Sequence, residues 1–234
     1  MIYVLVTGAS GYIGQHLVRS LIADGIRVRG FGSRPPPDGW PGSDWQQGDI
    51  CCAGHVNQAV HGCDTVIHLA CHPLGQSMQD PVSAFRVNAL GTLHILHAAH
   101  AAGVRQVVYS STAQVYGTAP HLPQREEDPP QPASPYAASK WRGEILCTTF
   151  ARCYGLGTTI LRLFNVYGPA LDGRDRTTAE AQFIRRALRG LPPAIQGDPS
   201  AGRDFIHMRD VVQAIKQAAQ RHGMGRSSIS ARAR

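Results

Sequence analysis

The 234-residue sequence lacks an apolar run of the ~20 residues that a membrane-spanning helix needs. We also expect no secretory leader, because the apolar stretch of residues 2–6 is short and has neither a basic segment nor a cleavage site. The apolar fraction of 43% and the charged fraction of 17% are those of a globular protein. We therefore expect a cytoplasmic protein with one full core and no membrane partner.

No CxxC pair occurs among the six cysteines, which stand at positions 51, 52, 63, 71, 147 and 153. Two adjacent cysteines suit neither a disulfide nor a zinc site, so buried, reduced thiols are expected. His94 and His97 are spaced i, i+3, but no nearby carboxylate or cysteine completes a metal site with them. We expect no metal, and we expect these two histidines on a helix surface or at an interface.

A long basic stripe is also absent, although the formal net charge is +7. The basic residues are scattered, and Arg226, Arg232 and Arg234 stand in a polar C-terminal stretch that is expected to lie outside the fold. Scattered charge does not match the clustered footprint of a nucleic-acid-binding surface. We expect no nucleic acid partner, and an anionic small ligand such as a nucleotide accounts for the charge.

What the sequence does contain is an alternation of apolar strands and amphipathic helices. Strands are expected over residues 2–6, 27–31, 65–70, 104–110 and 158–163. Helices are expected after Gly14 and over about 82–102, 136–154, 177–190 and 209–220. Residues 35–46 are expected to form an exposed loop, and residues 118–133 a Pro-rich acidic loop over a site. This alternation predicts an α/β fold, a doubly wound parallel sheet of the Rossmann type.

A glycine-rich turn joins the first strand to the first helix. Gly8, Gly11 and Gly14 stand in a GxxGxxG spacing, with Tyr12 and Ile13 inside it. Glycines let the backbone approach a pyrophosphate, and the N-terminus of the following helix supplies donors and partial positive charge. The motif predicts a dinucleotide site; the alternative is a tight turn that binds nothing.

The second strand lacks the acidic residue that usually ends it in NAD-binding units. Its end reads Phe31-Gly32-Ser33-Arg34, and Ser33 with Arg34 would suit a 2′-phosphate. This favours NADP slightly over NAD, and the alternative is an arginine that only faces solvent. Asp49, further on, is expected either to accept the adenine amino group or to cap the helix that follows.

Tyr136 and Lys140 stand four residues apart on an expected helix. Ser134 and Pro135 are a good cap and first residue for that helix, so the two side chains lie on one face. A free tyrosine titrates near pH ~10, and a nearby lysine favours the phenolate. The pair predicts a general acid/base, and the alternative is a packed ring beside a lysine.

Taken together, these motifs resemble the extended short-chain dehydrogenases/reductases of the nucleotide-sugar epimerase/dehydratase type, in particular UDP-glucose 4-epimerases. The resemblance covers residues 1 to about 220. It rests on Gly8/Gly11/Gly14, Asp49, His68-Leu69-Ala70, Asn88, Ser-Ser-Thr-Ala-x-Val-Tyr-Gly at 110–117, Tyr136/Lys140, Arg162-x-x-Asn165-x-Tyr-Gly-Pro and Arg203-Asp-Phe-Ile-His.

The resemblance implies a catalytic site in which Thr112 supplies a hydroxyl and Tyr136 acts as the acid/base. Lys140 would lower the pKa of Tyr136 and bind the nicotinamide ribose. The implied cofactor is NAD(P). The residues expected to contact it are Gly8, Gly11, Tyr12, Ile13, Gly14, Ser33, Arg34, Asp49, Ile50, Leu69, Ala70, Asn88, Ser110, Tyr136 and Lys140.

The implied substrate is a nucleotide-diphosphate sugar. Thr112 would contact the sugar, Asn165 the phosphates, and Arg203 would pair with the diphosphate. The alternatives are turn capping for Asn165 and a surface pair between Arg203 and Asp204. Related enzymes also form homodimers through the helices that here span about 83–102 and 136–154, so a homodimer is expected.

Two departures from the family pattern shape the functional hypothesis. Dehydratases carry Asp-Glu directly after the catalytic threonine, whereas this chain has Ala113 and Gln114, which favours a 4-epimerase. The resemblance also implies a C-terminal substrate lid, which we expect to be incomplete here. We expect an NAD(P)-binding domain with the catalytic residues at 1–164, a partial substrate-binding region at 165–222 and a disordered tail at 223–234. The alternatives are an NADP-dependent reductase, a dehydratase, and a non-catalytic dinucleotide-binding or regulatory protein.

Overall fold

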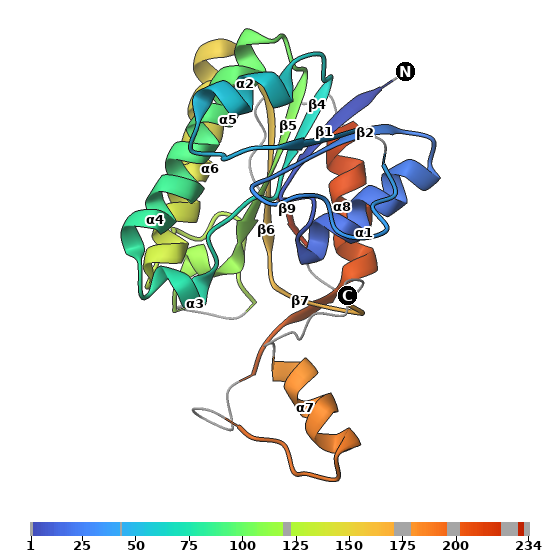
Figure 1. Ribbon diagram of the computed structural model, residues 1–234. Helices are drawn as coiled ribbons and strands as arrows, with labels where there is room; N and C mark the ends of the chain where they lie inside the picture. Colours follow the sequence, from blue (N-terminus) through green and yellow to red (C-terminus); the bar gives the residue numbers. More distant parts are fainter. Residues whose placement is uncertain are drawn as a thin grey trace.

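The computed structural model describes residues 2–42, 44–118, 123–170, 179–195, 202–220 and 229–231. A seven-stranded sheet runs through these residues in the order β3-β2-β1-β4-β5-β6-β9 (Figure 1), and every strand pair in it is parallel. The strands are β1 (Tyr3–Thr7), β2 (Arg27–Gly32), β3 (Asp44–Gln47), β4 (Thr65–His68), β5 (Gln106–Thr112), β6 (Gly157–Leu163) and β9 (Ile229–Ala231). The predicted Rossmann-type sheet is confirmed.

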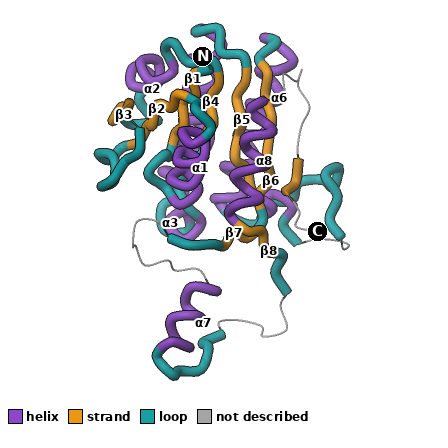
Figure 2. Tube along the Cα trace, turned by 90° about the vertical axis from the view of Figure 1, so that its right-hand side faces the viewer, coloured by secondary structure: helices purple, strands orange, loops and turns teal. Residues whose placement is uncertain are grey.

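Helices cover both faces of this sheet (Figures 1 and 2). On one face lie α2 (Ala53–Val60), α5 (Gly91–Ala101) and α6 (Pro135–Tyr154); on the other lie α1 (Tyr12–Ala23) and α8 (Met208–Gln220). Successive residues of β1 alternate between the two cores: Leu5 packs with the α2–α5–α6 side, and Val4 and Val6 pack with α1 and α8. Strands that are buried on both faces explain the unbroken apolar runs of the sequence.

The helix expected over about 82–102 has a π-helical turn in it. Helix α4 (Pro81–Phe85) begins where the Asp80 carboxylate accepts a hydrogen bond from the backbone N–H of Ser83 at 2.9 Å. A π-helical turn (Arg86–Leu90) then leads into α5. A short helix, α3 (Leu74–Ser77), precedes α4 and was not predicted. The π turn carries Asn88, whose contacts are described below.

Part of the expected loop at 35–46 belongs to the sheet. Strand β3 pairs with β2, and the rings of Trp40 and Trp45 pack edge to face with their centroids 4.8 Å apart. Gly30 of β2 makes room for them, because a Cβ atom there would lie 2.5 Å from Trp45 and 2.6 Å from Trp40. The polar β3 is an edge strand held by these indoles, which a local pattern does not reveal.

A second sheet of two strands begins at the expected domain boundary. Strands β7 (Asn165–Tyr167) and β8 (Phe205–His207) pair in parallel, and α7 (Ala179–Leu188) lies below them in Figure 1. Helix α8, however, follows β8 back onto α1 and the large sheet, so it packs with the Rossmann body.

Little of the tail expected over 223–234 can be compared with the structure. Residues 221–228 and 232–234 lie outside the described residues. Residues 229–231 form β9 beside β6, which differs from the expected disorder at these three positions. In the parts of the chain that the structure describes, no helix is long and apolar enough to cross a membrane.

Candidate active site

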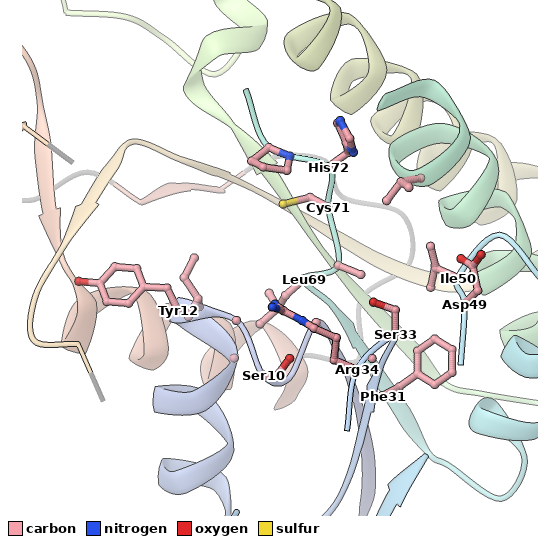
Figure 3. Close-up of a pocket in the computed structure, with 18 of the residues that line it drawn as sticks. Ser10, Tyr12, Phe31, Ser33, Arg34, Asp49, Ile50, Leu69, Cys71 and His72 are labelled. Atoms are coloured by element: carbon pink, nitrogen blue, oxygen red, sulfur yellow. The ribbon is translucent and has the colours of Figure 1, made fainter. Parts of the chain in front are cut away.

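A cavity of about 450 Å³ opens at the carboxyl ends of β1, β2 and β4 (Figure 3). This is the point where the strand order reverses, with β2 on one side of β1 and β4 on the other. Open α/β sheets bind ligands at such points. Eleven of the expected cofactor residues line it together: Gly8, Gly11, Tyr12, Ile13, Gly14, Ser33, Arg34, Asp49, Ile50, Leu69 and Ala70.

The glycine-rich turn is folded tightly against the rest of this cavity. Gly8 has a φ of +66°, and a Cβ atom there would lie 2.8 Å from the backbone nitrogen of Ala70. A Cβ atom on Gly14 would lie 2.4 Å from the carbonyl oxygen of Gly8. Gly11 precedes the first turn of α1, and no side chain caps that turn. The backbone N–H groups of the helix N-terminus are therefore presented to an anion, as a dinucleotide pyrophosphate requires.

The opposite end of the cavity carries Arg34 and Asp49. Arg34 and Ser33 are exposed at the end of β2, and Gln47 donates a side-chain hydrogen bond to the Ser33 carbonyl oxygen at 3.2 Å. Asp49 is exposed as well, and its Oδ1 atom accepts a hydrogen bond from the Cys51 N–H at 2.9 Å. Asp49 thus supports the turn before α2, whose own N-cap residue, Cys52, makes no side-chain cap.

Asn88 and Ser110 do not line the cavity. Asn88 is buried; its amide accepts from the His72 N–H at 2.7 Å and donates to the His72 carbonyl at 3.1 Å and to Ser139 Oγ at 2.9 Å. Because its hydrogen-bonding groups already meet protein partners, Asn88 holds the cavity wall around His72 against helix α6. Ser110 is half-buried within β5.

The three expected catalytic residues come together where β5 ends and α6 begins. Ser134 caps α6, since its Oγ accepts a hydrogen bond from the Ala137 N–H at 3.1 Å, and Pro135 opens the helix. Thr112 is the last residue of β5. Burial raises the pKa of the Tyr136 phenol well above its usual range, the charge of a Cys71 thiolate raises it further, and a hydrogen bond with Thr112 lowers it. The Thr112 hydroxyl and the Tyr136 phenol are therefore close enough to influence each other.

Lys140 lies beneath this pair with only 2% of its surface exposed. Its ammonium nitrogen is 4.3 Å from the centroid of the Tyr109 ring. Burial lowers the pKa of Lys140, whereas the negative charge of the Glu144 carboxylate raises it. Lys140 was expected to lower the pKa of Tyr136. Burial acts in the opposite direction and has the largest effect on the pKa of the phenol.

Cys71 connects the cavity with the catalytic group, and sequence reasoning missed it. It is exposed in the cavity wall just after β4, and its charge acts on both Tyr136 and Lys140. Figure 3 shows its sulfur atom pointing into the open space between Tyr12 and the end of β4. In the sequence, the only indication that Cys71 lies at the cavity is that it directly follows a strand expected to be buried.

The two expected substrate residues are brought together outside the cavity. Asn165 begins β7 and donates from its amide to the Asp204 carbonyl oxygen at 2.8 Å, while the neighbouring Arg203 is exposed. The same segment is tied to the glycine turn, because Tyr12 donates to the Gly168 carbonyl at 2.7 Å. The segment that follows β7 is thus in direct contact with the first residue of α1, next to the glycine turn.

The comparison with known proteins agrees with this geometry. Residues 4–229 match the NAD dependent epimerase/dehydratase family. The chain belongs to this family. The predicted fold class, the resemblance and the enzyme class are thereby confirmed.

Several members of the family are close enough to compare over nearly the whole chain. The UDP-glucose 4-epimerase of Mycolicibacterium smegmatis is 35% identical, over 94% of this chain and 74% of the relative. The dTDP-glucose 4,6-dehydratase of Streptomyces griseus is 32% identical, over 96% and 71%. The crystal structure of Thermus thermophilus UDP-glucose 4-epimerase in complex with NAD superposes with a TM-score of 0.86 at 32% identity, covering 99% of this chain and 78% of that one.

Proposed function

We propose that the chain is an NAD(P)-dependent nucleotide-sugar epimerase of the 4-epimerase type, which acts by transient oxidation of a sugar hydroxyl. The observation that carries the proposal is that Thr112, at the end of β5, lies near Tyr136, whose helix also carries the buried Lys140, next to a glycine-lined cavity that suits a dinucleotide. Kinship with UDP-glucose 4-epimerases supports the choice of substrate class.

The three residues have separate tasks in this proposal. Tyr136 removes a proton from the sugar hydroxyl and later returns it, while the hydroxyl of Thr112 holds the reacting oxygen through hydrogen bonds. Lys140, buried and cationic, favours the phenolate of Tyr136 and offers its N–H donors to the ribose. When bound, the nicotinamide supplies the redox chemistry by accepting a hydride from the sugar carbon and returning it.

The substrate phosphates are assigned to Asn165 and Arg203. Both stand at the start of the β7–β8 sheet, and the exposed guanidinium of Arg203 has the fork of donors that suits a diphosphate. In support of this assignment, the Asn165 amide donates to the backbone carbonyl of Asp204, the residue after Arg203, at 2.8 Å.

A dehydratase is less compatible with the site, although dehydratases are among the relatives. The turn after Thr112 (Ala113–Tyr116) carries Ala113 and an exposed Gln114, and neither side chain exchanges protons near neutral pH. A reductase is favoured only if Ser33 and Arg34 select NADP. We propose NADP slightly ahead of NAD as the cofactor. Cytoplasmic residence stays a prediction from the sequence.

A homodimer is proposed on the α4–α5–α6 face. Large apolar side chains are exposed there, at Val82, Phe85, Leu90, Leu93 and Ile145. A second copy of the same helices would cover them in a four-helix arrangement. Sedimentation velocity of the wild type and of Leu93→Glu tests this, because the charged variant should sediment as a monomer.

The function is tested with the purified full chain. Mass spectrometry first identifies any dinucleotide that copurifies, and UDP-glucose and dTDP-glucose are then supplied with NAD or NADP. Conversion of UDP-glucose to UDP-galactose without net change in absorbance at 340 nm is expected. A 4-keto-6-deoxy product would show a dehydratase, stoichiometric cofactor consumption a dehydrogenase or reductase, and binding without turnover a non-catalytic protein.

A further inference from the structure

A buried ion pair lies behind the catalytic group. Glu144 stands on α6 one turn after Lys140, with 5% of its surface exposed, and Arg162 stands on β6 with 7% exposed. The guanidinium holds the carboxylate with three contacts: Nε to Oε1 at 3.0 Å, Nε to Oε2 at 3.2 Å and Nη2 to Oε2 at 2.7 Å. This is a forked, charge-assisted arrangement.

The pair reaches every element that carries a reacting group. The Ser111 hydroxyl, one residue before Thr112, donates to Glu144, and Ser111 pairs in register with Arg162 across β5 and β6. Glu144 itself lies on the helix of Tyr136 and Lys140. One carboxylate therefore ties the end of β5 to α6, which are the two elements that bring Thr112 to Tyr136.

Arg162 also holds the segment that leads into α6. Its Nη1 atom donates to the carbonyl oxygen of Glu126 at 3.1 Å, and its guanidinium carbon lies 4.7 Å from the centroid of the Tyr116 ring. Both partners belong to the stretch between Thr112 and Tyr136. The backbone between the two catalytic hydroxyls is thus fastened at Tyr116 and at Glu126 by one side chain.

We propose that the Glu144–Arg162 pair is a positioning device, which sets Thr112 against Tyr136 and keeps the segment around Glu126 across the reacting groups. The role rests on the proposed function. A buried ion pair of this kind contributes little net stability compared with neutral residues of similar shape. Fixed geometry at the reacting atoms, by contrast, has a large effect on rate.

The decisive variant removes both charges at once. In Glu144→Gln/Arg162→Met neither partner is left as an unpaired buried charge, so the urea midpoint should stay near that of the wild type, whereas each single variant should lower it. With the double variant we expect kcat to fall at least ~10-fold, while KM and the Kd of NAD stay within about threefold. Arg105→Gln, which breaks the exposed pair with Asp64, is the matched control and should change none of these. Wild-type kcat in the double variant would overturn the proposal.

Arg162→Lys provides the conservative comparison. It keeps the charge but lacks the fork that reaches Glu144 and Glu126 together, so kcat should stay low and amide hydrogen exchange within 123–133 should accelerate. Full rescue of kcat by lysine, with exchange unchanged, would also count against a positioning role.

A readout that needs no turnover separates this inference from the proposed function. The sequence has only two lysines, Lys140 and Lys216, so carbon-13 lysine labelling gives two titrating signals. The charged or titratable groups around Lys140 are His68, Cys71, Tyr109, Tyr136, Glu144 and Cys147. Because Glu144 favours the ammonium form, Glu144→Gln should lower the pKa of Lys140 and leave Lys216, on the opposite face of the sheet, unchanged.

The two hypotheses then fail in different ways. If the wild type converts no nucleotide sugar but Lys140 titration and loop exchange shift as expected, the proposed function is wrong, and what stands is that the pair fixes the surroundings of Lys140 and the 123–133 segment. If the wild type turns over but neither kcat, exchange nor the Lys140 signal responds to the variants, the positioning role is wrong and the function stands.

Discussion

The ammonium nitrogen of Lys140 lies 4.3 Å from the centroid of the Tyr109 ring, and the Tyr109 hydroxyl donates to the backbone carbonyl of Lys140 at 3.1 Å. The aromatic face offsets part of the cost of burying the cation, and the hydroxyl fixes the helix backbone at the same residue. Helix α6 approaches this closely because position 143 is a glycine. A Cβ atom there would lie 2.2 Å from the Tyr109 hydroxyl oxygen.

Gly143→Ala should therefore destabilise the protein, although alanine favours helices. The overpacked methyl group displaces α6 from β5 at a cost of roughly 1–3 kcal/mol in the free energy of unfolding. Gly54→Ala in α2 is the control, because the added Cβ would meet only Cys52 Sγ at 4.0 Å. There the substitution should be neutral or stabilising by up to ~1 kcal/mol. Urea unfolding measures both, and equal effects would contradict the packing argument.

Tyr136→Phe should abolish turnover and leave cofactor binding nearly intact. The substitution removes only the hydroxyl that contacts Thr112, and Tyr136 does not line the cavity. Loss of a general acid/base costs about 10²–10⁴ in rate. Activity is followed with UDP-glucose, and the Kd of NAD by quenching of tryptophan fluorescence. Unchanged activity would disprove the assignment of the base.

Arg34→Ala tests the proposed preference for NADP. Arg34 is exposed at the cavity wall with Ser33, and no acidic side chain ends β2. Loss of one charge-assisted contact to a 2′-phosphate should raise the Kd of NADP about tenfold, or ~1.4 kcal/mol. The Kd of NAD, which lacks that phosphate, should change less than twofold. A larger loss for NAD than for NADP would show that Arg34 has another role.

Cys71 offers a chemical test of where the cofactor lies. It is exposed in the cavity, whereas Cys52 and Cys153 are exposed elsewhere on the chain. A bound dinucleotide should slow labelling of Cys71 by N-ethylmaleimide at least ~10-fold and leave the other two unaffected, as peptide mass spectrometry can measure. Equal labelling of Cys71 with and without NAD, at saturating concentration, would place the cofactor elsewhere.

The elements that could be predicted from the sequence are those whose residues follow a local pattern. Strands β1, β4 and β5 contain apolar runs, at residues 3–6, 66–67 and 107–109, and Ser134 and Pro135 mark the start of α6. The edge strand β3 was missed because it is held by contacts between distant residues, the indoles of Trp40 and Trp45 and the ion pair of Asp44 with Arg29, and not by an apolar pattern of its own.

The same distinction applies to the site. Glycines and Arg34 stand next to the strands they follow, so their place in a cofactor cavity could be predicted. The Glu144–Arg162 pair and the contacts of Asn88 join segments that are 18 and 51 residues apart in the chain, and no local pattern encodes them. Sequence therefore pointed to the reacting side chains and not to the residues that hold them.

His68 supplies a prediction about pH, because its ring is enclosed at the end of β4. The Thr92 hydroxyl donates to the Asn88 carbonyl at 2.6 Å, so His68 Nε2 must carry the proton that it shares with Thr92 at 3.1 Å. Nδ1 then accepts from the Thr7 hydroxyl at 2.7 Å. This neutral ring joins the strand before the glycine turn to the π turn of Asn88.

Burial, with the nearby charge of Lys140, lowers the pKa of His68 to about 3. The unfolded chain titrates near ~6.5, so below that pH it binds a proton that the folded protein does not, and stability falls as the pH drops toward 3. Between pH 7.5 and 4.5 this residue should remove ~2–3 kcal/mol from the free energy of unfolding. His68→Gln should be less stable at pH 7.5 but lose correspondingly less on acidification, whereas His97→Gln, exposed on α5, should follow the wild type. Urea unfolding at several pH values gives the free energy of unfolding as a function of pH. Parallel curves for His68→Gln and the wild type would show that His68 is not held neutral.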